Sequence, residues 1–115
     1  MRYAAPLKMN KIDSAITKVL GKAKYFGIYD GNSDEMKVIV NEQTGGPAIF
    51  GVLKSEGVDA VLTPHAGPGA VNASIRLGIK LYYCGDERKT LPEAVAEFKE
   101  GKYPQITAEN FEEYH

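Results

Sequence analysis

The stretch Val58-Asp59-Ala60-Val61-Leu62-Thr63-Pro64-His65-Ala66-Gly67-Pro68-Gly69 passes directly from an apolar run into a turn rich in glycine and proline. Residues 58–62 predict a buried strand, and residues 68–77, closed by Gly78, predict a helix. Pro68 suits the first helical position, because its missing N–H would have no partner there. The stretch therefore predicts a strand-turn-helix unit, and we call its loop, residues 63–69, the 63–69 turn.

The segments on either side repeat this alternation of strands and helices. Residues 79–84 predict the next strand, and Thr90-Leu91-Pro92-Glu93 carries the capping-box pattern of a helix that ends at Gly101. Upstream, residues 2–7 predict a first strand, and residues 24–41 predict a β-hairpin. We therefore expect an α/β fold with right-handed crossovers, in which the hairpin makes the sheet mixed.

Two further helices and a tail complete the expected organisation. Apolar residues at helical spacing predict a helix that Gly21 ends; they are Ile12, Ala15, Ile16, Val19 and Leu20. Gly45-Gly46-Pro47 would open a short second helix. We expect a single domain over residues 1–103 and an acidic tail over residues 104–115, where Phe111 and Tyr114 would dock a short last helix.

Composition narrows the classes of partner and compartment. The chain has 115 residues and a net charge of −1, which gives no whole-surface attraction for nucleic acid or anionic membranes. No apolar run approaches the roughly 20 residues that span a bilayer, and the first six residues do not resemble a signal peptide. Because the only cysteine, Cys84, cannot form an internal disulfide, we expect a cytoplasmic protein without nucleic-acid or membrane partners.

The 63–69 turn has the properties of an anion cradle. Gly67 and Gly69 have no Cβ, so a ligand would approach the backbone closely. The N–H groups of Gly69 and Ala70, with the positive end of the helix dipole, favour a negative ligand. The alternative is that the glycines only shape a tight turn. If the first strand runs parallel to the later two, their carboxyl ends form one edge that collects residues 7–10, His65 and residues 84–86.

His65 and Cys84 are suitable ligands for a soft metal or an iron–sulfur assembly. Alternatively, His65 is an ordinary surface residue and Cys84 is an ordinary buried residue at the end of a strand. Two ligands do not close a zinc site, so a metal would arrive already coordinated. Lys22 and Lys24 either supply positive potential or are solvated surface. Because the acidic residues form no catalytic set and the serines lack a nucleophile-elbow context, we expect no enzyme.

The chain resembles the dinitrogenase iron-molybdenum cofactor family, to which NifX and the C-terminal part of NifB belong. The resemblance covers most of residues 3–103 in order. It rests on five segments, residues 21–30 (GKAKYFGIYD), 57–62 (GVDAVL), 67–73 (GPGAVNA), 78–82 (GIKLY) and 90–101. Family members often carry a histidine two positions before the glycine of the first segment, and Val19 stands there in this chain.

This resemblance implies a ribonuclease-H-like, three-layer fold with a five-stranded mixed sheet flanked by helices. It also implies a non-catalytic carrier of iron-molybdenum cofactor, its precursor or a related metal–sulfur cluster, related to nitrogen fixation and served by cluster-donor or acceptor proteins. The expected cluster-binding residues are His65, Gly67, Gly69, Ala70, Asn72, Lys22 and Lys24. The expected metal ligands are His65 and Cys84. The alternatives are a binding module for a small phosphorylated metabolite or a protein-interaction domain, as a monomer or weak dimer.

Overall fold

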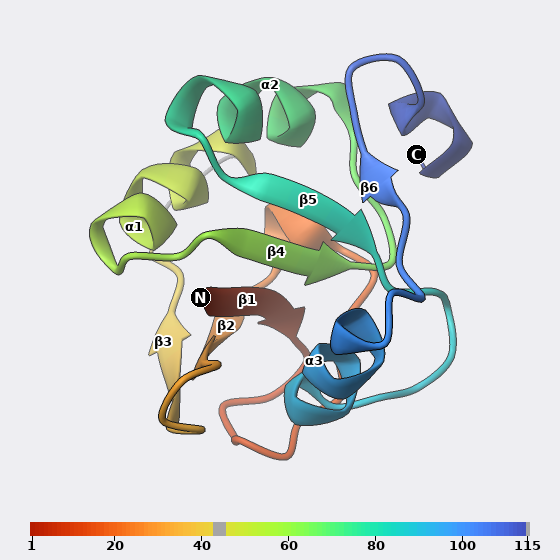
Figure 1. Ribbon diagram of the computed structural model, residues 1–115. Coiled ribbons are helices and arrows are strands. Elements are labelled where there is room, and N and C mark those ends of the chain that lie inside the picture. Colours follow the sequence, from red (N-terminus) through yellow and green to blue (C-terminus); the bar gives the residue numbers. More distant parts are fainter. Residues whose placement is uncertain (43–45, 115) are drawn as a thin grey trace.

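The computed structural model of the chain describes residues 1–42 and 46–114 (Figure 1). Within them the chain forms one mixed sheet of six strands and three α-helices. The strands are β1 (Arg2–Leu7), β2 (Tyr25–Asp30), β3 (Met36–Val40), β4 (Ala60–Thr63), β5 (Lys80–Tyr83) and β6 (Gln105–Ile106). The helices are α1 (Ile49–Ser55), α2 (Pro68–Leu77) and α3 (Leu91–Lys99), with short 3₁₀ turns η1 (Leu20–Lys22), η2 (Gly46–Ala48) and η3 (Phe111–Tyr114).

The sheet order is β3-β2-β1-β4-β5-β6. β1 lies in the middle, antiparallel to β2 and parallel to β4, and β4 is parallel to β5. The first strand is thus parallel to the two later ones, which was the condition for a shared edge, and the predicted hairpin, formed by β2 and β3, is confirmed. The carboxyl ends of β1, β4 and β5 consequently lie at one edge of the sheet.

The side chains form two apolar clusters, one on each face of the sheet. α1 and α2 cover the first face, where Phe50 and Val71 pack against Val61. α3 covers the other, where Leu91 packs with Leu7 and Leu62. Strands buried on both faces need nearly continuous apolar sequence, which explains the run in β4. The chain is therefore layered as helices, sheet and helix (Figure 1).

The expectation of five strands is wrong, because residues 105–106 add a sixth. β6 pairs antiparallel with β5, and its Ile106 is buried opposite Leu81. Two residues are too few to produce a periodic signal, so the sequence pattern did not predict this strand. Beyond it, Phe111 and Tyr114 pack on the α1–α2 side of the core, in a 3₁₀ turn.

The predicted helix over residues 12–20 is also wrong. Ala15 and Ile16 instead form isolated bridges to Thr90 and Leu7, so this segment, residues 8–19, crosses the strand ends as an irregular strap. Ser14 explains the difference, since its hydroxyl accepts a hydrogen bond from the Met9 N–H (2.9 Å) and donates one to the Ala15 carbonyl (3.0 Å). Such local bonds compete with the helical ladder. The helix predicted to open at Gly45 begins as η2 and α1, although residue 45 itself lies outside the described residues.

Removing the Ser14 hydroxyl should destabilise the fold. Ser14 is buried, so Ser14→Ala leaves the Met9 N–H without its acceptor and should lower the free energy of unfolding by about 1–2 kcal/mol. Ser55→Ala is the matched control, because its exposed hydroxyl bonds only within its own helix. Urea unfolding of both variants measures the difference. Equal effects of the two substitutions would contradict the role given to Ser14.

Candidate functional site

The predicted strand-turn-helix unit is present, and its turn is held by internal hydrogen bonds. The buried hydroxyl of Thr63 donates to the His65 carbonyl (2.8 Å) and accepts from the His65 N–H (3.3 Å). The Ala66 N–H donates to the Tyr114 carbonyl (2.9 Å), so the C-terminal turn braces this loop. These bonds fix the backbone of the turn immediately before α2.

α2 begins at Pro68, after Gly67 in an extended conformation (φ −92°, ψ 177°). No side chain caps this end of the helix. The first N–H groups of a helix have no partner within it, and here they belong to Gly69 and Ala70. The N-terminal end of α2 therefore keeps both the donors and the dipole that favour an anion.

A pocket of about 270 Å³ opens at this end of α2, and we call it the α2 pocket. Its lining consists of residues 19–22, Pro47, His65, Gly67, Gly69 and Ala70. The structure thus brings Lys22 and His65, both predicted from the sequence, into one cavity. It also places there Val19, whose side chain is 50% exposed.

Three other predicted site residues lie outside this pocket. Lys24 is exposed, with its ammonium 6.0 Å from the centre of the Tyr25 ring. Asn72 is an exposed residue of α2 that does not line the pocket. Cys84 lines a different cavity of about 280 Å³, between the end of β5 and the C-terminal turn.

Gly69 has a packing role that the sequence did not reveal. A Cβ at this position would lie 3.2 Å from Cγ of Pro47. The missing side chain therefore lets η2 lie against the first turn of α2, in addition to leaving the backbone open. Pro47 consequently forms part of the pocket wall, and only a close approach seen in three dimensions identifies it.

Cys84 is 1% exposed, and burial raises the pKa of its thiol to about 12. The positive charge of Lys89 acts in the opposite direction and lowers that pKa. Its ammonium also donates a hydrogen bond to the Cys84 carbonyl. The same ammonium lies 3.1 Å from the Glu97 carboxylate, which also accepts a hydrogen bond from the Tyr103 hydroxyl at 2.5 Å. Thiolates, not thiols, bind metals, so the resting state of Cys84 is unsuited to coordination.

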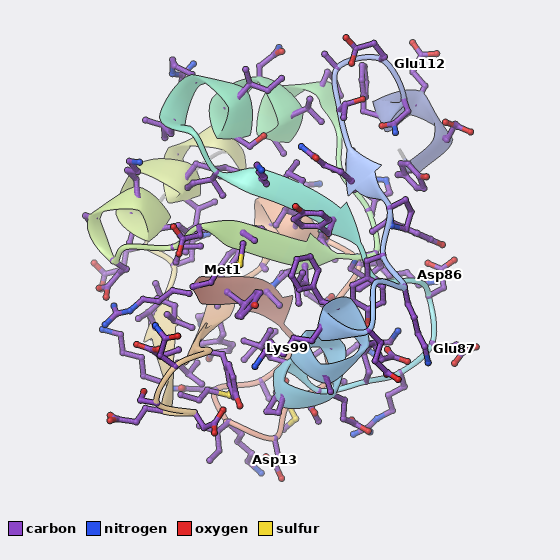
Figure 2. The ribbon with its side chains drawn as sticks, viewed as in Figure 1. Met1, Asp13, Asp86, Glu87, Lys99 and Glu112 are labelled. Carbon is purple, nitrogen blue, oxygen red and sulfur yellow. The ribbon has the colours of Figure 1, made fainter. Side chains whose placement is uncertain are left out.

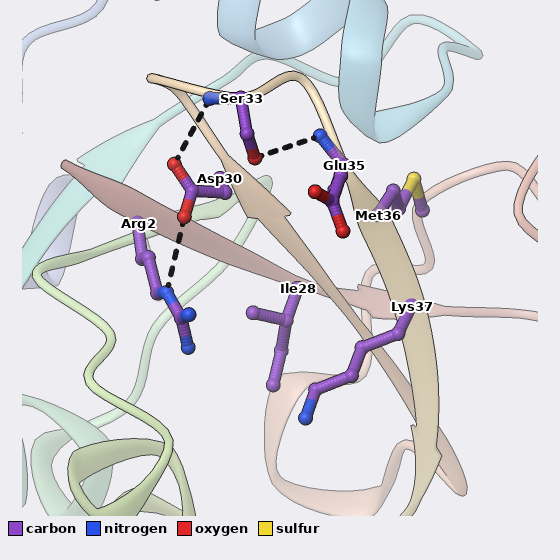
Figure 3. A pocket seen from close by; sticks show the side chains of 7 residues that line it. All are labelled: Arg2, Ile28, Asp30, Ser33, Glu35, Met36 and Lys37. Carbon is purple, nitrogen blue, oxygen red and sulfur yellow. Dashed lines mark hydrogen bonds and ion pairs between the residues drawn. The ribbon is translucent and has the colours of Figure 1, made fainter.

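Another pocket, of about 290 Å³, lies at the opposite end of β1 (Figure 3). Its two cations already have partners: Arg2 lies 3.4 Å from Asp30 and donates to the Glu56 carbonyl, while Lys37 pairs with the Glu56 carboxylate at 2.6 Å. The Asn32 and Ser33 N–H groups, with Arg2, lower the pKa of Asp30. Because its two cations are already paired, this pocket offers an anionic ligand less than the α2 pocket does.

The donor set limits what the α2 pocket can hold. Within residues 1–42 and 46–114, no group of three or more histidine, cysteine or acidic side chains is placed to hold a metal ion. His65 supplies an imidazole to the lining of the pocket, and most of the other lining residues are apolar. Such a site does not fit a bare ion.

The chain belongs to the dinitrogenase iron-molybdenum cofactor family, whose sequence pattern matches residues 1–101. The fold is similar to that of a Thermotoga protein provisionally assigned as NifB, with 29% identity, a TM-score of 0.77, and coverage of 93% of this chain and 94% of the other. The apo form of the orange protein from Desulfovibrio gigas shares the fold at 24% identity and a TM-score of 0.80, covering 90% and 91%. No curated protein matches the chain.

Membership confirms the family that the sequence resembles. The two structural likenesses extend over nearly the whole chain. Among the described residues, every helix is too short or too polar to traverse a lipid bilayer.

Proposed function

We propose that this protein is a non-catalytic carrier of iron-molybdenum cofactor, its precursor or a related metal–sulfur cluster, bound in the α2 pocket. The observation that carries the proposal is the meeting of His65, Lys22 and the N-terminal end of α2 in one cavity. Family membership supplies the chemical class of the cargo. The cluster is a substrate to be carried, so it arrives with most of its coordination complete.

Each part of the pocket has a distinct task in this proposal. The His65 imidazole contacts a metal atom at the cluster surface, and neutral imidazole is a common ligand of iron. The N–H groups of Gly69 and Ala70 face the cluster's negative charge, and Lys22 adds a nearby cation. The apolar wall excludes water and thereby strengthens these interactions.

The other predicted residues take lesser parts. Lys24 and Asn72 contribute outside the pocket, through long-range potential and a polar rim. Cys84 would reach a metal only after the loop that follows β5 opens, because its sulfur is buried in another cavity. We therefore assign the first protein–metal contact to His65.

We extend the proposal to the architecture and the cellular setting. The strand order, with a parallel β1-β4-β5 core and an antiparallel hairpin, supports a ribonuclease-H-like classification. Residues 1–103 would form the family domain, and residues 104–115 an addition that completes its sheet edge. The protein would act in the cytoplasm as a monomer or weak dimer that exchanges its cargo with donor and acceptor proteins.

Anaerobic titration with isolated iron-molybdenum cofactor tests the proposal. A coloured one-to-one complex should form, with a dissociation constant on the order of 1 μM or lower. His65→Ala should weaken it about tenfold, the lower range for loss of one supporting interaction at a metal. Lys22→Ala should weaken it more than Lys24→Ala, because Lys22 lines the pocket and Lys24 does not. Absence of a complex at micromolar protein would overturn the proposal.

A further inference from the structure

A separate cavity of about 310 Å³ lies where β1, β4 and β5 end, and we call it the strand-end pocket. Lys8 follows β1, Pro64 follows β4, and residues 86–88 follow β5, while residues 16–18 of the strap complete the lining. In open α/β sheets, ligands bind in the crevice outside the carboxyl ends of the parallel strands. The pocket therefore occupies the position where this class of fold most often binds small molecules.

Three cations from three different segments line this pocket: Lys8, Lys18 and Arg88. Within residues 1–42 and 46–114, no carboxylate forms an ion pair with Lys8 or Arg88. The hydroxyl of Thr17 adds a neutral hydrogen-bonding group. The Arg88 guanidinium and the Lys8 and Lys18 ammonium groups therefore have N–H donors available for a ligand in this pocket.

Two carboxylates, Asp86 and Glu87, also line the pocket and oppose an anion. Lys18 lies 3.8 Å from Asp86, and both side chains are more than half exposed, so this pair contributes little energy. Figure 2 shows Asp86 and Glu87 on the loop between β5 and α3, at the margin of the molecule. They consequently reduce the positive potential at the rim without replacing the cations.

We propose that the strand-end pocket binds a small, doubly charged tetrahedral oxyanion of the phosphate type. Arg88 would hold two of its oxygens in the paired geometry that guanidinium favours, and Lys8 and Lys18 would neutralise the remaining charge. The ion comes either free or as the phosphate group of a monoester. This inference does not rest on cluster binding, because the residues differ from those of the α2 pocket.

The two pockets are neighbours along the chain. Pro64 and Lys18 line the strand-end pocket, and the next residues, His65 and Val19, line the α2 pocket. An anion bound at the strand ends would therefore fix the strap and the turn that together shape the α2 pocket.

Amide chemical shifts during titration with inorganic phosphate test the site directly. At constant ionic strength, residues 8, 17–18 and 86–88 should shift together, with a dissociation constant on the order of 1 mM. The Arg2 and Asp30 amides at the opposite end of β1 should not shift. A phosphate monoester, titrated in parallel, distinguishes the two sources of the ion by whichever binds more tightly. Shifts no larger than those caused by chloride would overturn the proposal.

A second test replaces cations and a carboxylate of the pocket separately and compares their effects on phosphate binding. Lys8→Gln and Arg88→Gln should each weaken phosphate binding by about fivefold, whereas Asp86→Asn should tighten it by about threefold, the range for partly exposed charges. Lys99→Gln is the matched control, because Lys99 is an exposed residue of α3 that does not line the pocket (Figure 2). A merely structural role would not produce opposite signs, so weakening by Asp86→Asn would contradict the proposal.

Discussion

The free energy of unfolding is expected to fall by on the order of 3 kcal/mol between about pH 8 and about pH 11, because Cys84 stays protonated in the folded chain. Burial raises the pKa of this thiol from its ordinary value of 9.0 to about 12. Above about pH 9 the unfolded chain releases the cysteine proton, whereas the folded chain retains it. Rising pH therefore favours the unfolded state, and stability is complete only below about pH 9.

The neighbours of Cys84 explain why the folded pKa lies so high. The thiol is enclosed by the apolar cluster beneath α3, which contains Leu62 and Leu91, and this desolvation is the largest cause. Lys89 lowers the pKa through its charge, but Glu97 and Asp86 act against it. Because the charge of Lys89 and those of the two carboxylates oppose each other, burial remains the dominant effect on the pKa of Cys84.

Urea unfolding at several pH values measures this effect, with Cys84→Ser as the matched control. A serine hydroxyl does not titrate in this range, so the variant should lack the part of the decline that begins near pH 9. It should retain the part above about pH 10, which comes from the tyrosines whose pKa is also raised in the folded chain. Alkylation of the native thiol near neutral pH should also be slow, because the reaction needs the thiolate. Parallel pH profiles for the two proteins would contradict the assignment of the decline to Cys84.

The elements predicted correctly are those whose signals are local. α2 begins at a proline and ends at Gly78, which adopts a left-handed conformation (φ 73°), as a helix-ending glycine should. The predicted capping box is present, since the Thr90 hydroxyl accepts from the Glu93 N–H and the Glu93 carboxylate accepts from the Thr90 N–H. Such signals involve neighbours within four residues, so one sequence is enough to identify them.

The strap and β6 were not predictable because tertiary contacts determine them. Ala15 and Ile16 are buried as the helical pattern requires, but through bridges to Thr90 and Leu7. Apolar spacing that is typical of a helix is therefore found here in the irregular strap. β6 exists because Leu81 and Ile106 pair across the sheet edge, a contact between residues that are distant in the sequence.

In the candidate site, too, local features could be predicted from the sequence and tertiary contacts could not. His65 and Gly69 were identified by their place in a strand-to-helix turn, which is a local feature. Pro47 enters the pocket wall only through η2, and the grouping of Lys8, Lys18 and Arg88 depends on three separate strand ends. Cys84 was assigned to the same sheet edge as His65, yet its side chain lines another cavity. Sequence placed each residue at an edge but did not give the direction of its side chain.

Replacing Val19 by histidine should tighten cluster binding on the order of 100-fold, since even a supporting partner of a metal ligand changes affinity by about 10- to 100-fold. Val19 is half exposed and lines the α2 pocket together with His65. An imidazole here would place a second metal-binding group in the pocket that His65 lines. Because the side chain is not part of the core, we expect the fold to tolerate the substitution.

A double-mutant cycle shows whether the two imidazoles act on one ligand. Val19→His, His65→Ala and the double variant are titrated without oxygen with isolated iron-molybdenum cofactor, and with Co²⁺ as a simpler optical probe of paired imidazoles. If both rings coordinate, most of the gain from Val19→His should disappear in the double variant. Val19→Gln is the control, because its amide has polarity without an imidazole. A gain of equal size in the presence and absence of His65 would show that residues 19 and 65 bind independently, and would contradict a shared site in the α2 pocket.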